Sequence, residues 1–218
     1  SLSGCATQQY VDEQIAGVNT RISAVDSKAT DAIQRADAAS AAAAAAQGTA
    51  QTAASDAATA NQRLDQLTEK RAHVHAGGGE DKLQKHRDKG KMTARERIAS
   101  LVDDGSFQET GAFRRNRTTT FGMDKADMPA DGVVTGAGYV LGRPVHLASQ
   151  DFTVMGGSFS EVQSQKISRI ADRALETGIP LIGLGDSGGA RIQEGVRSLA
   201  AYGEVFVRNV MASGVIPQ

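Results

Sequence analysis

Residues 179–195 read IPLIGLGDSGGARIQEG, and this stretch decides the fold. Its apolar beginning, residues 179–184, predicts a buried strand. The pair Gly188-Gly189 then predicts a tight turn, because glycine adopts backbone conformations closed to other residues. Apolar residues at helical spacing over residues 196–211 predict an amphipathic helix after the turn.

The same order of elements occurs once more, earlier in the chain. Residues 132–141 and 144–149 alternate or run apolar around Gly142-Arg143, which predicts a hairpin. A second glycine pair, Gly156-Gly157, follows and leads into a helical pattern that ends near Glu176. Strands that alternate with helices predict an α/β layered domain.

The glycine pairs at the two turns suggest a chemical use. Amides at the start of a helix lack intrahelical partners, and glycine lets a substrate oxygen approach them without side-chain obstruction. We therefore expect Gly188 and Gly189, with Gly156 and Gly157 as second donors, to form an oxyanion hole. On spacing alone, plain strand-to-helix turns are the more common explanation of such pairs.

Composition narrows the class of protein. The 218-residue chain has a net charge of −1, which disfavours nucleic acid as a partner. Its one cysteine, Cys5, excludes an internal disulfide. No apolar run reaches transmembrane length. Every aromatic residue except Tyr10 lies at Phe107 or beyond, so we expect the ordinary hydrophobic core in the second half.

Residues 11–67 carry an unbroken heptad pattern made largely of alanine. Alternating steps of four and three from Val11 reach an apolar residue each time, ending at Leu67. Alanine favours helix but buries little area, so a single such helix needs partner helices. The pattern predicts a homo-oligomeric coiled coil, and the alternative is a disordered Ala/Ser/Thr/Gln linker.

Residues 2–5, Leu-Ser-Gly-Cys, resemble the lipobox of bacterial lipoproteins, in which the cysteine is lipidated. Together with the alanine-rich pattern, residues 2–67 resemble the major outer-membrane lipoprotein family, whose members form trimeric helical rods. That resemblance implies lipidation of Cys5. Contact with a membrane is expected only if Cys5 is lipidated. The alternative is a cysteine without a role.

A basic stretch separates the two halves. It contains Lys89, Lys91, Arg95 and Arg97, which we interpret as a solvated face. Within it, Thr93 and Glu96 have the spacing of a capping box, which predicts a helix from residue 94 to about residue 102. The three histidines of the region, His73, His75 and His86, are interpreted as surface residues, and no metal site is expected.

Six collinear segments of the second half resemble the carboxyltransferase subunits of biotin-dependent acyl-CoA carboxylases. They are residues 77–80 (GGGE), 89–98 (KGKMTARERI), 131–136 (DGVVTG), 149–153 (SQDFT), 156–158 (GGS) and 186–195 (DSGGARIQEG). The resemblance is strongest to propionyl-CoA and methylmalonyl-CoA carboxyltransferases and implies a crotonase-like fold. The expected organisation is a lipobox-like leader (1–10), a coiled-coil helix (11–67), a helical segment (68–110) and an incomplete crotonase-like domain (111–218).

The carboxyltransferase resemblance implies transfer of a carboxyl group between carboxybiotin on a separate carrier protein and the α-carbon of an acyl-CoA. It places Gly188 and Gly189 on the pair that stabilises the thioester enolate. Lys89, Lys91, Arg95 and Arg97 become candidates for binding the coenzyme A phosphates. It also implies a homo-oligomer, a cytoplasmic location, and a site completed by a second domain, so we expect no transferase activity from this chain alone.

Two other functions compete with this interpretation. Residues 185–189, GDSGG, match the nucleophile segment of chymotrypsin-like serine proteases, but Ser187 would lie between a strand and a helix, without an evident His-Asp pair. The second alternative is a lipid-anchored structural rod with a truncated passenger. It implies the outer membrane in place of the cytoplasm.

Overall fold

The computed structural model describes residues 7–218, so the lipobox and Cys5 lie outside the described part and lipidation stays a prediction. The described residues form two compact units that divide between Leu64 and Asp65. None of the described helices is long and apolar enough to cross a membrane.

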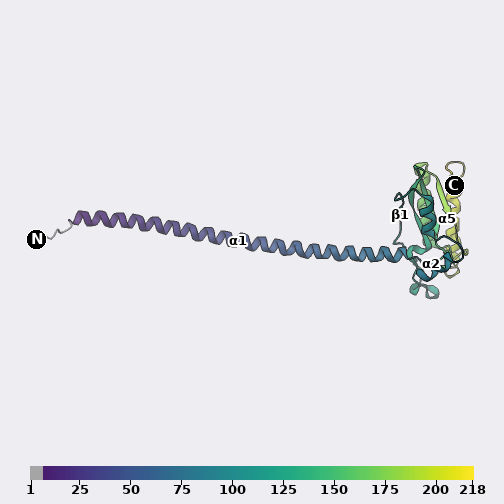
Figure 1. Ribbon diagram of the computed structural model, residues 1–218, viewed down its shortest axis with the longest axis horizontal. Coiled ribbons are helices and arrows are strands. Elements are labelled where there is room, and N and C mark those ends of the chain that lie inside the picture. Colours follow the sequence, from purple (N-terminus) through teal and green to yellow (C-terminus); the bar gives the residue numbers. More distant parts are fainter. Residues whose placement is uncertain (1–6) are drawn as a thin grey trace. The chain divides into compact units, whose positions relative to one another are not determined.

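A single helix, α1 (Gln8–His75, 68 residues), makes up most of the first unit. At 1.5 Å per residue it is about 100 Å long (Figure 1). The helical prediction for residues 11–67 is confirmed and the disordered linker is wrong. The helix continues eight residues further than expected, and Val74 is its one buried residue.

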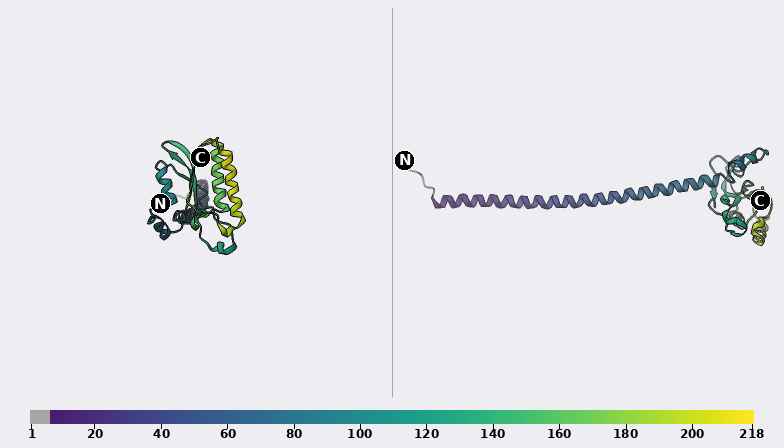
Figure 2. Two further views of the ribbon diagram at one scale, coloured as in Figure 1. Left: turned by 90° about the vertical axis from the view of Figure 1, so that its right-hand side faces the viewer. Right: turned by 90° about the horizontal axis from the view of Figure 1, so that it is seen from below.

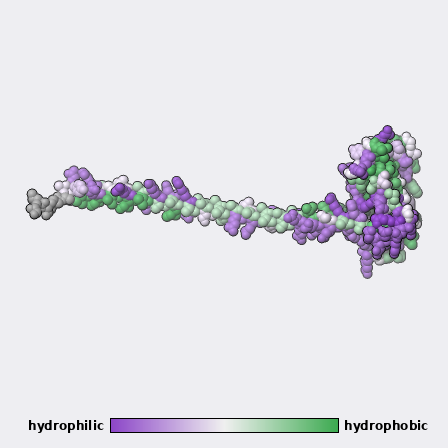
Figure 3. Space-filling view, viewed as in Figure 1, coloured by the Kyte–Doolittle hydropathy of each residue, from purple (hydrophilic) through white to green (hydrophobic). Residues whose placement is uncertain are grey.

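Much of the apolar seam of α1 is exposed in the described part of the chain. Ile22 and Val25 expose 61% and 66% of their surface, and Leu64 exposes 60%. Figure 3 shows the alanine-rich middle of the helix as a pale green, weakly apolar surface. Association into a coiled coil is consistent with this exposure and stays a prediction.

Two short helices follow, α2 (Glu80–Arg87) and α3 (Ala94–Leu101). The capping box of α3 is confirmed: the Thr93 amide donates to the Glu96 carboxylate at 2.8 Å, and the Glu96 amide donates to the Thr93 hydroxyl at 3.3 Å. This reciprocal pair sets the start of α3 at the predicted residue.

One four-stranded sheet forms the centre of the second unit, in the order β1-β2-β3-β4. Its strands are β1 (Gln108–Thr110), β2 (Val133–Val140), β3 (Arg143–Gln150) and β4 (Leu181–Leu184). The β2-β3 hairpin around Gly142 is confirmed, and β4 lies parallel to β3. The edge strand β1, antiparallel to β2, was not predicted.

Helices cover both faces of this sheet. Ile98 of α3 packs on Val134, Val145 and Leu147, which form the main core cluster. Strand side chains alternate between faces, so His146 and Ala148 point to the opposite side. That side is covered by α4 (Glu161–Thr177), which packs against α5 (Val196–Ala212) (Figure 2). The predicted α/β layers are therefore present.

Four short 3-10 segments lie in the connections between the described strands and helices. Their bounds are Thr120–Lys125, Pro129–Gly132, Met155–Gly157 and Ile192–Glu194.

Candidate active site

The carboxyl ends of β3 and β4 lie at one edge of the sheet, because the two strands are parallel and Ser149 is in register with Leu184. The loops that follow them contain the two predicted glycine pairs. Crevices beyond the carboxyl ends of parallel strands are common ligand sites. The sheet topology therefore brings the two glycine pairs together.

Three backbone hydrogen bonds join these loops. The Gly188 amide donates to the Gly156 carbonyl, the Phe159 amide to the Gly189 carbonyl, and the Arg191 amide to the Phe159 carbonyl, each at 2.8 Å. A parallel bridge between Phe159 and Ala190 continues the pairing. The predicted meeting of the glycine turns is confirmed.

Glycine is required where the loops come closest. A Cβ atom at Gly157 would lie 2.2 Å from the Asp186 carbonyl oxygen, and Gly157 has a φ of +61°. Gly189 has a φ of +105°, which is also unfavourable for other residues. Gly78 packs against the loop that follows β3. A Cβ atom on Gly78 would lie 2.0 Å from the Thr153 carbonyl oxygen in that loop.

The structure alters which amides are available to a substrate oxygen. The Gly188 amide is engaged by Gly156, and the Gly157 amide donates to the Val154 carbonyl at 2.9 Å. The Gly189 amide donates to the Ser187 hydroxyl at 3.1 Å. A hydroxyl rotates freely, so a bound oxygen could recruit the Gly189 amide with less disturbance than the Gly188 or Gly157 amide. The roles of all four glycines as oxyanion donors stay predictions.

A cluster of aromatic and charged side chains borders the loop at Asp186. His86 stacks on Phe152 with ring centroids 5.9 Å apart, and its Nε2 lies 3.4 Å from the Asp186 carboxylate. Lys91 lies 3.1 Å from the same carboxylate and 5.3 Å from the Phe152 ring centroid. His86 is only 6% exposed, so its interpretation as a surface residue was wrong. Among residues 7–218, no group of His, Cys, Asp and Glu could hold a metal ion.

The four candidate cations for coenzyme A differ in their surroundings. Arg95 forms two hydrogen bonds with Glu109, at 2.8 and 3.1 Å. Arg97 donates to the carbonyls of Gln150 and Gly185, so it joins the ends of β3 and β4. These two arginines are therefore not part of a freely solvated face. Lys89 and Lys91 are exposed and remain candidates for phosphate contacts.

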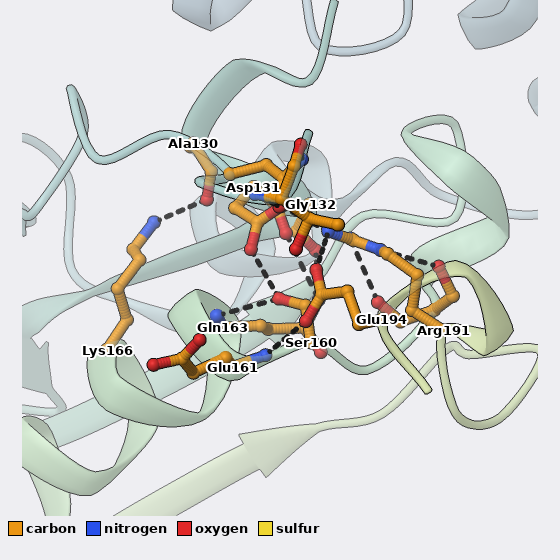
Figure 4. A network of polar contacts seen from close by, with 12 residues as sticks. Ala130, Asp131, Gly132, Ser160, Glu161, Gln163, Lys166, Arg191 and Glu194 are labelled. Carbon is orange, nitrogen blue, oxygen red and sulfur yellow. Dashed lines mark hydrogen bonds and ion pairs between the residues drawn. The ribbon is translucent and has the colours of Figure 1, made fainter. Parts of the chain in front are cut away.

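A buried ionic network holds the loop after β4 (Figure 4). Arg191 is fully buried and contacts the Asp131 carboxylate at 2.5 Å and the Glu194 carboxylate at 3.2 Å. The Ser160 hydroxyl donates to Asp131, and Glu194 accepts the Glu161 amide at 2.8 Å. Sequence reasoning missed these partners, although Asp131, Arg191 and Glu194 all lie in the segments that carried the resemblance.

Ser187 has no surroundings typical of a nucleophile. Its hydroxyl contacts only Gly189, at 3.1 Å to the amide and 3.5 Å to the carbonyl. Within the part of the chain that the structure describes, no hydrogen bond or ion pair links Ser187 to a histidine. His146 lies on β3 with both ring nitrogens unpartnered. The geometry gives the serine protease interpretation no support.

A family model for the carboxyl transferase domain matches residues 85–218. The chain belongs to this family. It is 59% identical over 162 residues to the methylmalonyl-CoA carboxyltransferase 12S subunit of Propionibacterium freudenreichii subsp. shermanii, and 52% identical over 166 residues to the mitochondrial propionyl-CoA carboxylase beta chain of Homo sapiens.

Solved structures of carboxyltransferases resemble the second unit. A transcarboxylase 12S hexamer with bound methylmalonyl-coenzyme A has a TM-score of 0.71, with 59% identity over 72% of this chain. A single-chain long-chain acyl-CoA carboxylase has a TM-score of 0.61 at 30% identity, covering 71% of this chain and 16% of its own. These neighbours support the crotonase-like fold.

The chain spans about a third of the length of the curated relatives that it matches. The match to the 12S subunit includes 74% of this chain and 31% of that subunit. The match to the human beta chain includes 75% of this chain and 30% of the beta chain. The whole of α1 precedes residue 85, at which the family match begins.

Proposed function

We propose that the chain binds an acyl-CoA thioester and stabilises its enolate on the backbone amides of the two joined glycine loops. The observation that carries this proposal is the hydrogen bond between the Gly188 amide and the Gly156 carbonyl, which fixes the loops against each other at the carboxyl ends of β3 and β4. Preorganised donors of this kind stabilise charge that develops in a transition state.

Loss of a proton from the α-carbon moves negative charge to the thioester oxygen. The Gly189 amide would donate to this oxygen in place of the Ser187 hydroxyl, with no change in the backbone. The buried Arg191 network keeps the loop in position during the exchange. A donor placed in this way contributes on the order of 10²- to 10³-fold in rate.

The reaction we propose is transfer of a carboxyl group between carboxybiotin and a propionyl-CoA or methylmalonyl-CoA type thioester. Carboxybiotin, carried by a partner protein, would supply the carboxyl group. The C–C bond would form as the N–C bond to biotin breaks, and the freed ureido nitrogen would take up the α-proton. The similarity to carboxyltransferases named for these thioesters supports the choice.

Assembly and location are part of the same proposal. One relative is named as a hexamer, which supports a homo-oligomer here, and the exposed seam of α1 offers a second surface for association. Acyl-CoA and carboxybiotin are intracellular compounds, which supports a cytoplasmic location over an outer-membrane anchor.

The test is the binding of a CoA nitronate, which carries a fixed negative charge where the enolate oxygen would lie. In isothermal titration of the full chain, the dissociation constant of the nitronate should be at least ten times smaller than that of propionyl-CoA, because transition-state analogues bind more tightly than substrates. Ser187→Ala should keep this preference, since the hydroxyl only occupies the Gly189 amide. Equal affinities for the two ligands would refute the proposal.

A further inference from the structure

A pocket distinct from the glycine loops lies between the edge strand β1 and helix α4. It has a volume of about 360 Å³, enough for a small molecule. Its lining is unusually cationic: it consists of Thr110, Gly111, Arg114, Thr135, Lys166, Arg169, Ile170 and Arg173. No carboxylate belongs to this lining.

The cations come largely from one face of α4. Lys166, Arg169 and Arg173 are spaced i, i+3 and i+7, which places them together. Like charges at such spacing repel each other unless a counter-charge is present. Among the described residues, no ion pair or hydrogen bond engages the guanidinium of Arg169 or of Arg173. In the described structure, therefore, no direct ion pair offsets the repulsion between these two guanidinium groups.

Lys166 forms the buried part of the pocket. Its side chain is 3% exposed and donates to the carbonyls of Ala130 and Val133. Burial lowers the pKa of Lys166 to about 8, and Glu109 and Asp131 oppose the change only in part. Both carboxylates have other partners, since Arg95 binds Glu109 and Arg191 binds Asp131.

The walls of the pocket leave room for a ligand. Gly111 has a φ of +69°, and a Cβ atom there would lie 3.4 Å from the Lys166 side chain. The hydroxyls of Thr110 and Thr135 lie on the strands opposite α4, and Thr135 is 1% exposed. These two hydroxyls donate to each other's backbone carbonyls. The donors left for a ligand are therefore the guanidinium groups of the exposed arginines, which match what phosphate oxygens need.

We propose that this pocket is a second ligand site, which binds the phosphate group of a small molecule. The guanidinium groups of Arg169 and Arg173 bind the phosphate oxygens at the opening, and Lys166 neutralises charge from below. The inference does not rest on the proposed carboxyl transfer, because none of the lining residues belongs to the two glycine loops.

Isothermal titration of the full chain with inorganic phosphate and with pyrophosphate, at low ionic strength, tests the site. We expect saturable binding to the parent chain. The dissociation constant of the Arg169→Gln/Arg173→Gln variant should be at least ten times larger than that of the parent chain. Arg143→Gln is the matched control, because Arg143 is an exposed arginine at the hairpin turn outside the pocket. Tighter binding of pyrophosphate than of phosphate would identify a diphosphate-bearing ligand, and equal binding a single phosphate group.

Three results would overturn the proposal. The first is no saturable binding of either anion, and the second is an equal loss of affinity in the double variant and in Arg143→Gln. The third is displacement of the bound anion by coenzyme A, because the phosphates would then belong to the thioester substrate and the site would not be a second one. Both substituted arginines of the pocket are exposed, so circular dichroism should show an unchanged fold.

Discussion

The amide of Gly188 and the carbonyl oxygen of Gly156 lie 2.8 Å apart, and this hydrogen bond connects loops that are separated in sequence by the whole of α4. It makes the two glycine pairs one structural unit. Changes on either side of the contact should therefore affect both the stability of the unit and the proposed binding of a thioester.

Gly157→Ala should destabilise the protein by about 2–4 kcal/mol, because the new methyl group meets the Asp186 carbonyl oxygen at 2.2 Å and the backbone is left-handed. Gly142→Ala is the matched control: its φ of +74° imposes a similar backbone strain, but open space surrounds it. That control should cost about 1 kcal/mol. Urea denaturation measures both, and equal losses would mean that the close approach of the loops is wrong.

Arg191→Met should cost about 3–5 kcal/mol, because it leaves the buried carboxylates of Asp131 and Glu194 without a counter-charge. Arg208→Met removes an arginine paired with Asp172 and Glu204 near the surface. It should cost about 1 kcal/mol or less. Chemical denaturation of the two variants is the measurement. Similar losses would contradict the assignment of Arg191 as the centre of the buried network.

The stability of the domain should fall as the pH drops below the ordinary histidine pKa of about 6.5. Burial, with a smaller effect of Arg173, lowers the pKa of His146, so the folded state binds this proton less readily than the unfolded state. The stabilising effect is complete above the unfolded pKa and is lost as the pH falls through the folded pKa. His146→Leu should therefore show a smaller loss of unfolding free energy between pH 7 and pH 5.

The control for this pH dependence is the parent chain, measured in the same buffers. If His146→Leu also kept the parent's pH dependence, His146 would not be its source.

Association through α1 can be tested at the apolar seam. Ile15→Asp/Ile22→Asp should reduce the sedimentation coefficient of the full chain, because charges would replace side chains that the seam needs to bury. Thr20→Asp/Ser27→Asp adds the same charge on the outer face and should leave the coefficient unchanged. An unchanged coefficient for the seam variant would exclude α1 as an oligomerisation surface.

Local patterns in the sequence were sufficient for much of this fold. The capping box at Thr93, the hairpin around Gly142 and the strand-glycine-helix order each depend on residues close together in the chain. The carboxyltransferase segments then indicated which glycine turns would meet. β1 was not predicted because three residues carry too little periodicity to distinguish a strand from a loop.

Contacts between residues that are distant in the sequence could not be predicted from these local patterns. The sequence does not indicate that Arg95 pairs with Glu109, because its neighbours in the chain are those of a solvated helix face. It also does not indicate that Arg97 joins the ends of two strands. The stacking of His86 on Phe152 likewise depends on a contact across 66 positions of sequence. Burial of polar groups is decided by tertiary packing, which residue type alone does not reveal.

The most direct test of the enolate site is the amide resonance of Gly189 in ¹⁵N-labelled protein during titration with the CoA nitronate. We predict a downfield shift of the Gly189 proton and slower hydrogen exchange at saturation, because the amide leaves the Ser187 hydroxyl for a charged oxygen. Gly142, remote in the hairpin turn, should not change. A saturated complex in which the Gly189 resonance stays at its free position would contradict the central claim.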